Sequence, residues 1–253
     1  MLNQIDVQDI VTITKEAGDA IMQIYKQDFE VEYKQDNSPL TLADKKANDI
    51  IETGLNQLSV NFPILSEEGK NVPYEDRKHW DYFWLVDPLD GTKEFVKKND
   101  EFSVNIALIH KNMPILGVVY APALDVCYWA VKGEGAFKNG QKLPLKSKEQ
   151  RKNYKIVVSR SHMSHETQAF IEQIKTNKKK ELISKGSSLK VCLVAEGEVD
   201  IYPRLAPTME WDTGASHVIV NESGMKLRGF VDNSYTNFLY NKENLLNSEF
   251  IVA

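Results

Sequence analysis

The sequence predicts a mixed α/β protein in which sheets and helices are stacked in layers. The first half contains three consecutive apolar runs separated by short turns, the pattern of an antiparallel meander. The second half alternates strand-like runs with helical patterns, which indicates an α/β layer. With 253 residues, 42% of them hydrophobic, the chain can bury the cores of one large or two small domains.

The chain opens with an amphipathic helix. Its apolar face is formed by Ile10, Ile13, Ala17, Ile21 and Ile24. These residues recur three or four positions apart, as one face of a helix requires. A strand is predicted at residues 29–33, a turn at 37–39 and a second helix from 41 to 58.

Short strands follow. They are predicted at residues 64–65, 82–86, 103–109, 114–120 and 126–131, and Asn139-Gly140 indicates a further hairpin. The strands at 103–109, 114–120 and 126–131 form the expected meander. The strands at 64–65 and 82–86 each lead directly into acidic residues.

A polar stretch at residues 142–153 lacks apolar periodicity, so we place a domain boundary there. This predicts an N-terminal domain of residues 1–147 and a C-terminal domain of residues 148–253. In the second domain, strands are expected at 155–159, 181–184, 199–202 and 250–252, and helices at 166–174, 189–196 and 213–221. Lys178, Lys179 and Lys180 are interpreted as a solvated turn.

Composition excludes several functional classes. A net charge of −5 gives no general attraction to nucleic acid or to an anionic membrane. No apolar run approaches the roughly 20 residues that a membrane-spanning helix needs. The N-terminus lacks the pattern of a signal peptide, and Cys127 and Cys192 are expected to be buried thiols in a reducing compartment. No nucleic-acid partner is expected, and no protein partner can be inferred.

Three acidic clusters lie where predicted elements begin or end. They are residues 66–69 (SEEG), 87–92 (DPLDGT) and 211–215 (WDTGA). Carboxylates at such ends converge in the crevice where layered α/β folds bind ligands. Each cluster also has an ordinary structural explanation. Glu67 and Glu68 could be exposed loop charges, Asp87-Pro88 a turn with Asp90 capping a helix, and Asp212 a helix cap. Outside the clusters, Asp44 could likewise belong to a helix cap.

The second cluster favours a functional explanation. Pro88 fixes the backbone between Asp87 and Asp90, and Gly91 allows close approach of a ligand. The result is two carboxylates and a carbonyl for a hard cation, beside N–H groups that can hold a phosphate. Because no His or Cys takes part, the pattern points to Mg²⁺ or Mn²⁺.

These motifs resemble a known family. Residues 84–95, WLVDPLDGTKEF, are similar to the first motif of the lithium-sensitive, magnesium-dependent phosphatases typified by inositol monophosphatase. Residues 210–213, EWDT, resemble the second motif, and residues 65–68 supply the paired glutamates. Within this superfamily, further passages resemble the CysQ group of 3′(2′),5′-bisphosphate nucleotidases: residues 36–39, 102–122, 158–162, 186–197 and 202–204.

The resemblance implies an αβαβα sandwich like that of inositol monophosphatase and fructose bisphosphatase. It also implies two or three Mg²⁺ ions, with Mn²⁺ as a substitute. The implied metal ligands are Glu67, Asp87, the Leu89 carbonyl, Asp90 and Asp212. Glu68 would assist them or help hold a third ion, and Asp44 would accept a hydrogen bond from Thr92, which orients the attacking water.

The resemblance also implies the substrate contacts. They are Glu67, Leu89, Asp90, Gly91, Thr92, Ser161, His162, Ser187, Lys190, Arg204 and Asp212. Within this set, Lys190 and Arg204 are the natural partners of a phosphate that is retained. Without the resemblance, the favoured interpretation is a solvated helix residue for Lys190 and a helix-entry residue for His162.

The expected activity is removal of the 3′-phosphate of adenosine 3′,5′-bisphosphate (PAP) to give AMP, a step in sulfur metabolism. The alternatives are an inositol monophosphatase or other sugar-phosphate phosphatase, and a non-catalytic sensor that binds phosphonucleotides. The family implies a cytoplasmic location, in some members with peripheral association at the cytoplasmic face of the bacterial inner membrane.

Overall fold

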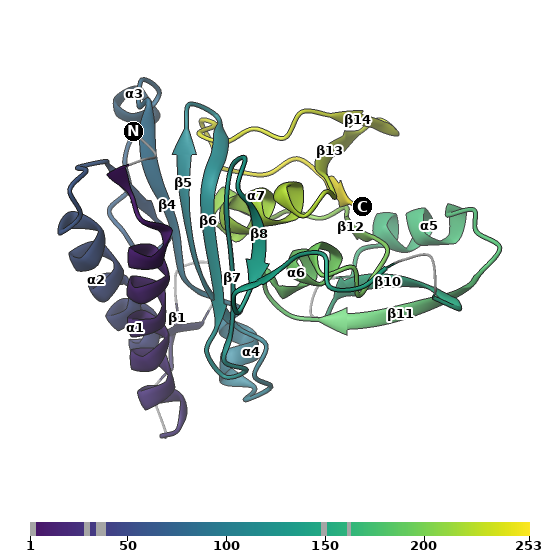
Figure 1. Ribbon diagram of the computed structural model, residues 1–253, viewed down its shortest axis with the longest axis horizontal. Coiled ribbons are helices and arrows are strands. Elements are labelled where there is room, and N and C mark those ends of the chain that lie inside the picture. The colour runs from purple at the N-terminus through teal and green to yellow at the C-terminus, as the bar shows by residue number, and fades with distance from the viewer. Residues whose placement is uncertain (1–3, 28–30, 34–38, 148–150, 161–162) are drawn as a thin grey trace.

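The computed structural model describes residues 4–27, 31–33, 39–147, 151–160 and 163–253. Its elements stack in five alternating layers of helix and sheet (Figure 1). Helices α1 (Val7–Tyr25) and α2 (Leu42–Asn56) form one outer layer, beside a small β1–β2 pair (Val31–Tyr33 and Pro39–Thr41). The αβαβα sandwich is therefore confirmed as the arrangement of the described residues.

A seven-stranded sheet forms the second layer. Its spatial order follows the chain from β3 to β9, with β3 and β4 parallel and the other neighbours antiparallel. The strands are β3 (Ile64–Ser66), β4 (Tyr82–Asp90), β5 (Ser103–His110), β6 (Met113–Ala121), β7 (Val126–Val131), β8 (Gly135–Lys138) and β9 (Gln141–Lys142). The predicted meander and the hairpin at Asn139-Gly140 are both confirmed.

Helices α6 (Leu189–Ala195) and α7 (Gly214–Glu222) form the middle layer, and α7 packs across β5 to β8. Beyond them lie a parallel pair, β10 (Asn153–Ser159) and β11 (Lys179–Lys185), and a four-stranded sheet in the order β12-β15-β13-β14. These four strands are β12 (Tyr202–Arg204), β13 (Leu227–Val231), β14 (Ser234–Thr236) and β15 (Phe250–Val252). Helix α5 (His165–Gln173) packs against β12 on the far side.

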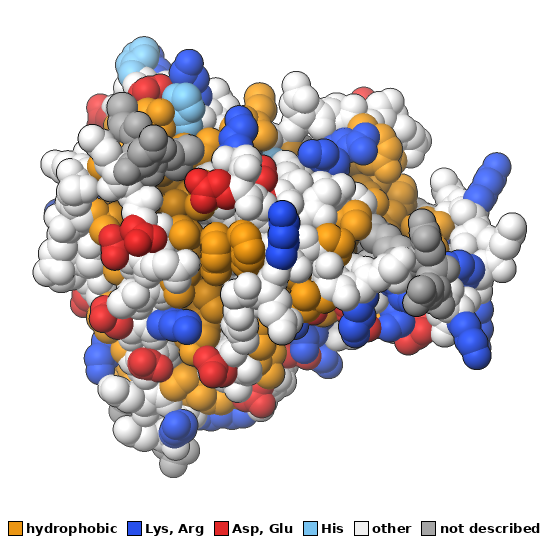
Figure 2. Space-filling view, in the orientation of Figure 1, with side chains coloured by type: hydrophobic (Ala, Val, Ile, Leu, Met, Phe, Trp, Pro, Cys, Tyr) orange, Lys and Arg blue, Asp and Glu red, His pale blue; other side chains and the backbone are white. Residues whose placement is uncertain are grey.

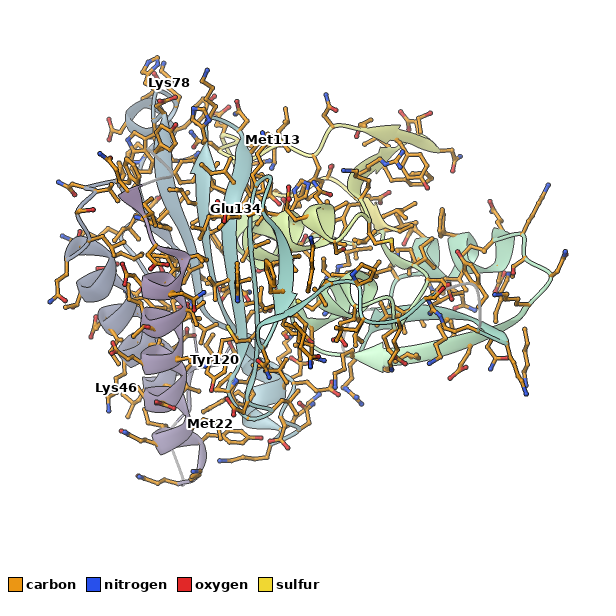
Figure 3. The ribbon with its side chains drawn as sticks, in the orientation of Figure 1. Met22, Lys46, Lys78, Met113, Tyr120 and Glu134 are labelled. Atoms are coloured by element: carbon orange, nitrogen blue, oxygen red, sulfur yellow. The ribbon has the colours of Figure 1, made fainter. Side chains whose placement is uncertain are left out.

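The first helix shows how the outer layer is held on the sheet. Asp6 caps α1 by accepting a hydrogen bond from the Gln8 N–H at 2.9 Å. Tyr120 of β6 lies beside α1, as Figure 3 shows. Its ring occupies the space over Gly18, where a Cβ would lie 2.6 Å from the ring. Four of the five apolar residues predicted for this face are buried and Ile24 is half-buried, and this burial stabilises the helix.

The hydrophobic core is continuous across the middle layer. One cluster joins Leu85 and Val119 of the large sheet to Cys192 of α6 and Ile219 of α7. Cys127 and Cys192 are both buried, unpaired thiols, as predicted. The division of the chain at residue 148 stays a prediction.

Several element boundaries differ from the sequence prediction. Strand β4 continues through Asp90 instead of ending at Val86, and β12 begins at Tyr202, where we expected a strand at 199–202. The sequence analysis missed α3 (Tyr74–Arg77), β13 and β14, which lack a strong apolar period. Phe29 and the first two residues of the predicted turn at 37–39 lie outside the described residues, and Pro39, the third, begins β2 instead.

The interpretation of residues 178–180 as a turn is wrong for two of its lysines. Lys179 and Lys180 belong to β11, and the Lys180 ammonium donates to the carbonyls of Ile171 (2.7 Å) and Glu172 (2.9 Å) near the end of α5. A cation stabilises a helix at that end, because the exposed carbonyls carry partial negative charge. Figure 2 shows Lys and Arg side chains gathered toward the end of the molecule where β10, β11 and α5 lie.

Among the described residues, no helix combines the length and the apolar character needed to cross a membrane.

Candidate active site

Asp87 and Asp90 reach one pocket because β4 is irregular between them. Asp87 pairs with Asn105 of β5 and Asp90 with Ser103, so β4 carries one residue more than its partner over this stretch. In a regular strand, residues three positions apart point to opposite faces. The bulge removes this alternation, and Pro88, which has no N–H for the ladder, lies inside it.

Asp212 comes to the same pocket from a short 3₁₀ turn, Glu210–Asp212. Its Oδ2 accepts a hydrogen bond from the Met209 N–H at 2.8 Å. Glu210 is wholly buried and accepts hydrogen bonds from the N–H groups of Asn241 (2.6 Å) and Lys242 (2.9 Å) and from the Lys242 ammonium (2.6 Å). Glu210 therefore anchors the turn that presents Asp212, a role that the sequence analysis did not assign.

The three aspartates form the one group among the described residues whose ligand atoms lie close enough to hold a metal ion. One oxygen from each of Asp87, Asp90 and Asp212 lies within 4.8 Å of the others. Burial, and then the charges of Glu67, Asp90, Asp212 and Asp44, raise the pKa of Asp87 well above its usual range. Burial and the charges of Asp90 and Glu67 raise the pKa of Asp212 to about 8. A set of crowded carboxylate oxygens fits a hard divalent cation.

The remaining predicted acidic residues lie around this group. The Glu67 N–H donates to the Val86 carbonyl at 3.1 Å, which places Glu67 beside β4, at the rim of the pocket. Asp44 is buried in the first turn of α2. Neither Asp44 nor Glu68 is among the described residues that line the pocket. The alternative that Asp212 caps the next helix is wrong, because Thr213 occupies the capping position.

Thr92 begins a short helix, α4 (Thr92–Val96), directly after the left-handed Gly91. Its hydroxyl donates to the Leu89 carbonyl at 3.4 Å. The structure therefore places the Thr92 hydroxyl, which is predicted to orient the water, beside the Leu89 carbonyl, which is predicted to bind a metal ion. The predicted hydrogen bond from Thr92 to Asp44 stays a prediction.

A cavity of about 390 Å³ collects most of the predicted residues. Its lining includes Glu67, Asp87, Leu89, Asp90, Gly91, Thr92, Ser187, Lys190, Arg204 and Asp212. Ser161 and His162 lie outside the described residues. Residues far apart in the chain thus meet in one pocket between the large sheet and the second half of the chain.

The basic side of the pocket is formed by Lys190 of α6 and Arg204 of β12, both buried. The Lys190 ammonium donates to the Ser187 carbonyl and lies 5.7 Å from the centre of the Tyr202 ring. Burial lowers the pKa of Lys190 to about 8, although the charge of Asp90 opposes this effect. Arg204 Nη2 donates to the Pro207 carbonyl at 3.0 Å. The alternative that Lys190 is a solvated helix residue is therefore wrong.

Ser188, which directly precedes α6, contacts two of the three aspartates on the acidic side. Its N–H and its hydroxyl lie 2.5 Å and 2.8 Å from Asp90 Oδ2, and the hydroxyl also lies 2.7 Å from the Asp212 carbonyl. Asn105 Nδ2 donates to the same hydroxyl at 3.0 Å. The sequence analysis missed this residue, because a serine at the start of a helix resembles an ordinary cap.

Comparisons with known proteins agree with this geometry. The family model described as the inositol monophosphatase family matches residues 2–249. Among curated proteins, the 3′(2′),5′-bisphosphate nucleotidase CysQ of Salmonella typhimurium is 46% identical over 222 residues, which cover 86% of this chain and 88% of that protein. The enzyme of the same name from Buchnera aphidicola is 43% identical, with 96% and 92% coverage.

A solved structure is also similar. The crystal structure of CysQ from Bacteroides thetaiotaomicron, described as a bacterial member of the inositol monophosphatase family, superposes with a TM-score of 0.87. It is 44% identical in sequence and covers 98% of this chain and 97% of its own. Because the family model, the relatives and the fold agree over almost the whole length, this chain belongs to the inositol monophosphatase family.

Proposed function

We propose that this protein is a metal-dependent 3′(2′),5′-bisphosphate nucleotidase that hydrolyses the 3′-phosphate of PAP to AMP and phosphate. The observation that carries the proposal is the pocket itself, in which an acidic wall of Asp87, Asp90 and Asp212 faces buried Lys190 and Arg204. A substrate with one phosphate to lose and one to keep satisfies both walls. The CysQ relatives, named as bisphosphate nucleotidases, support the same activity.

The proposed cation is Mg²⁺, with Mn²⁺ as a substitute. Glu67, Asp87 and the Leu89 carbonyl would hold one ion, and Asp87, Asp90 and Asp212 a second, with Glu68 assisting or helping to hold a third. When bound, Mg²⁺ supplies charge stabilisation for the attacking and leaving oxygens of an in-line displacement. The carboxylate donors support this choice, since hard oxygen ligands suit Mg²⁺ and Mn²⁺.

The chain's own groups would perform the remaining tasks. Asp44 would accept a hydrogen bond from Thr92 and so orient the hydroxyl toward the attacking water. The N–H groups of Gly91 and Thr92 would hold the phosphate that leaves. Lys190 and Arg204 would hold the 5′-phosphate that stays, because charge-assisted contacts are the strong ones. Ser187, Ser161 and His162 are further proposed substrate contacts, and the cytoplasmic location stays a prediction.

The test is phosphate release from PAP and from inositol 1-phosphate, each with millimolar Mg²⁺ and with a chelator. We expect rapid, Mg²⁺-dependent release from PAP and slow release from inositol 1-phosphate. Asp87→Asn, purified in parallel, should release almost none, which excludes a contaminating phosphatase. Faster release from inositol 1-phosphate would favour the sugar-phosphate alternative. Binding of PAP without any release would favour the sensor.

A further inference from the structure

A segment proposed to contact the nucleotide begins at the edge where two parallel strands end. Strands β10 and β11 pair in register up to Ser159 and Lys185, so their carboxyl ends lie side by side. Residues 161–162 follow β10, and the segment Gly186–Lys190 follows β11. Whatever fixes these two strand ends therefore also fixes the start of the Gly186–Lys190 segment.

Glu101 lies at these ends although it comes from the first half of the chain, just before β5. Its two carboxylate oxygens accept a bidentate pair of hydrogen bonds from Arg160, each at 2.8 Å. They also accept from the Gly186 N–H at 2.8 Å, and the Lys185 ammonium lies 3.1 Å away. One buried carboxylate thus binds donors from both strand ends.

The position of Glu101 is itself fixed. Its N–H donates to Asn99 Oδ1 at 3.1 Å, and the next residue, Phe102, is fully buried against Phe95 and Tyr25. Burial alone would raise the pKa of Glu101, but hydrogen bonds from Arg160 and Lys185 hold it below its ordinary value. The carboxylate is therefore a charged anchor built into the rigid first half.

The Gly186–Lys190 segment packs directly on this anchor. A Cβ at Gly186 would lie 2.7 Å from the Glu101 carbonyl oxygen and 2.7 Å from Glu94 Cγ, so only glycine fits there. Two residues later, the Ser188 N–H donates to Asp90. The short piece from 186 to 188 is thus held at one end by Glu101 and at the other by Asp90.

The Ser187 carbonyl, which fixes the position of the Lys190 ammonium, lies between these two anchors. Ser187 has a left-handed backbone, with φ of +48°, and its carbonyl accepts the hydrogen bond from the Lys190 ammonium. Such a backbone persists in a residue other than glycine only where its surroundings enforce it. Removing one anchor frees the Ser187 carbonyl, and the ammonium then loses its fixed position.

We propose that Glu101 is a positioning residue for substrate selection, which fixes the Gly186–Lys190 segment so that Lys190 meets the retained phosphate. The inference rests on the proposed function for its substrate. Glu101 itself touches neither substrate nor metal in this scheme. Its effect should therefore appear mainly in KM for a bisphosphate, with smaller changes in kcat and in the Mg²⁺ dependence, because the Ser188 contacts with Asp90 still hold the other end of the segment.

The chain offers a matched control in Glu198. This carboxylate accepts from Lys155 (2.8 Å) near the opposite, amino end of β10 and forms an ion pair with Lys146. It is a second carboxylate between two cations, one of which belongs to β10, and it does not line the pocket. Loss of Glu198 should lower stability without changing KM.

The experiment compares Glu101→Gln, Glu101→Asp and Glu101→Ala with Glu198→Gln, using steady-state kinetics on PAP and on 3′-AMP, which has no 5′-phosphate. We expect Glu101→Gln to raise KM for PAP about tenfold to a hundredfold, because misplacing a contact by about 1 Å can cost that much. KM for 3′-AMP should change less than about threefold. Glu101→Asp, which keeps the charge, should recover part of the loss, and Glu198→Gln should leave both KM values unchanged.

Amide hydrogen exchange of the unliganded protein gives a second readout that needs no activity. Residues 186–190 should exchange faster in Glu101→Gln than in wild type and not in Glu198→Gln. If wild type hydrolyses neither substrate, the proposed function fails, and exchange still decides whether Glu101 holds the segment. Equal KM increases on both substrates, or unchanged exchange of the segment, would overturn the inference. Should Glu101→Ala not fold, the isosteric Gln variant carries the test.

Discussion

The two walls of the pocket carry opposite charge, and burial acts on both in the same way. On the acidic wall, burial and mutual repulsion raise the pKa of Asp212 to about 8. On the basic wall, burial lowers the pKa of Lys190 to about 8. In each case the charged form is made costly by removal from water.

The walls differ in what relieves that cost. The carboxylates of Asp87, Asp90 and Asp212 crowd together, so a bound cation between them would relieve their repulsion. The Ser187 carbonyl and the nearby charge of Asp90 already stabilise the charged form of Lys190 in part. A bound anion would stabilise it further. The acidic wall should therefore control catalysis and the basic wall selectivity.

The largest effect is expected on the acidic wall. Asp90→Asn should lower kcat at least about 100-fold, which corresponds to about 2.7 kcal/mol in activation free energy, because it weakens the proposed metal site. Circular dichroism should stay that of wild type. Near-native turnover in saturating Mg²⁺ would exclude Asp90 as a ligand, and loss of the dichroism signal would give it a structural role instead.

The next effect is expected on the basic wall. Lys190→Ala and Arg204→Ala should each lower kcat/KM for PAP roughly 10- to 150-fold, since a charge-assisted contact contributes about 1.5–3 kcal/mol. Most of the change should be in KM, because a contact equal in ground and transition states leaves kcat unaltered.

The comparison substrate for these two variants is 3′-AMP, whose turnover should change little. The concentration of Mg²⁺ that gives half-maximal activity should not move. Equal losses on both substrates would place Lys190 and Arg204 at the leaving phosphate and contradict the division between the walls.

A smaller effect concerns the stability of the acidic wall. Mg²⁺ at about 100 times its Kd should raise Tm by about 5–10 °C, because it binds the folded chain and relieves the repulsion. In Asp87→Asn, the metal-free Tm should exceed that of wild type and the Mg²⁺ increment should shrink. Differential scanning calorimetry with NaCl at matched ionic strength is the measurement. A Tm that does not change when Mg²⁺ is added would mean that the folded protein binds no Mg²⁺.

The smallest effect is expected at a residue whose pKa is shifted mainly by burial and not by crowding with like charges. His217 of α7 is buried, with Nδ1 3.0 Å from the Tyr240 hydroxyl, and burial lowers its pKa to about 3. Between pH 6.5 and 3 the unfolded chain gains a proton there that the folded chain does not, so stability falls as pH falls. Between pH 7 and 5 this histidine alone should cost about 2 kcal/mol.

The measurement is urea unfolding at pH 7 and pH 5 in saturating Mg²⁺, for wild type and His217→Gln. The variant should lose less stability than wild type on acidification, even if it is less stable at pH 7. An identical pH dependence in both proteins would show that His217 is not the group responsible.

The motif residues could be predicted because they are local in sequence. Asp87, Pro88 and Asp90 lie in one short run, and their types alone indicate a hard-cation site. The helices α1 and α2 could also be predicted from the sequence, because their apolar residues recur at a regular helical spacing over many residues. Strands β13 and β14 were missed because their short, mixed patterns show no clear alternation of apolar and polar residues, although the two strands pair with each other as a local hairpin.

The sequence by itself determined the fold class, the acidic motifs and the family of this protein, because each of these can be recognised from residue types at fixed spacing. Only the tertiary structure decided that Glu101 meets Arg160 and Gly186, that Ser188 joins Asp90 to Asp212, and that Lys190 is buried. These contacts join residues that lie dozens of positions apart along the chain. No local pattern encodes them, because burial and long-range hydrogen bonds exist only once the layers have packed.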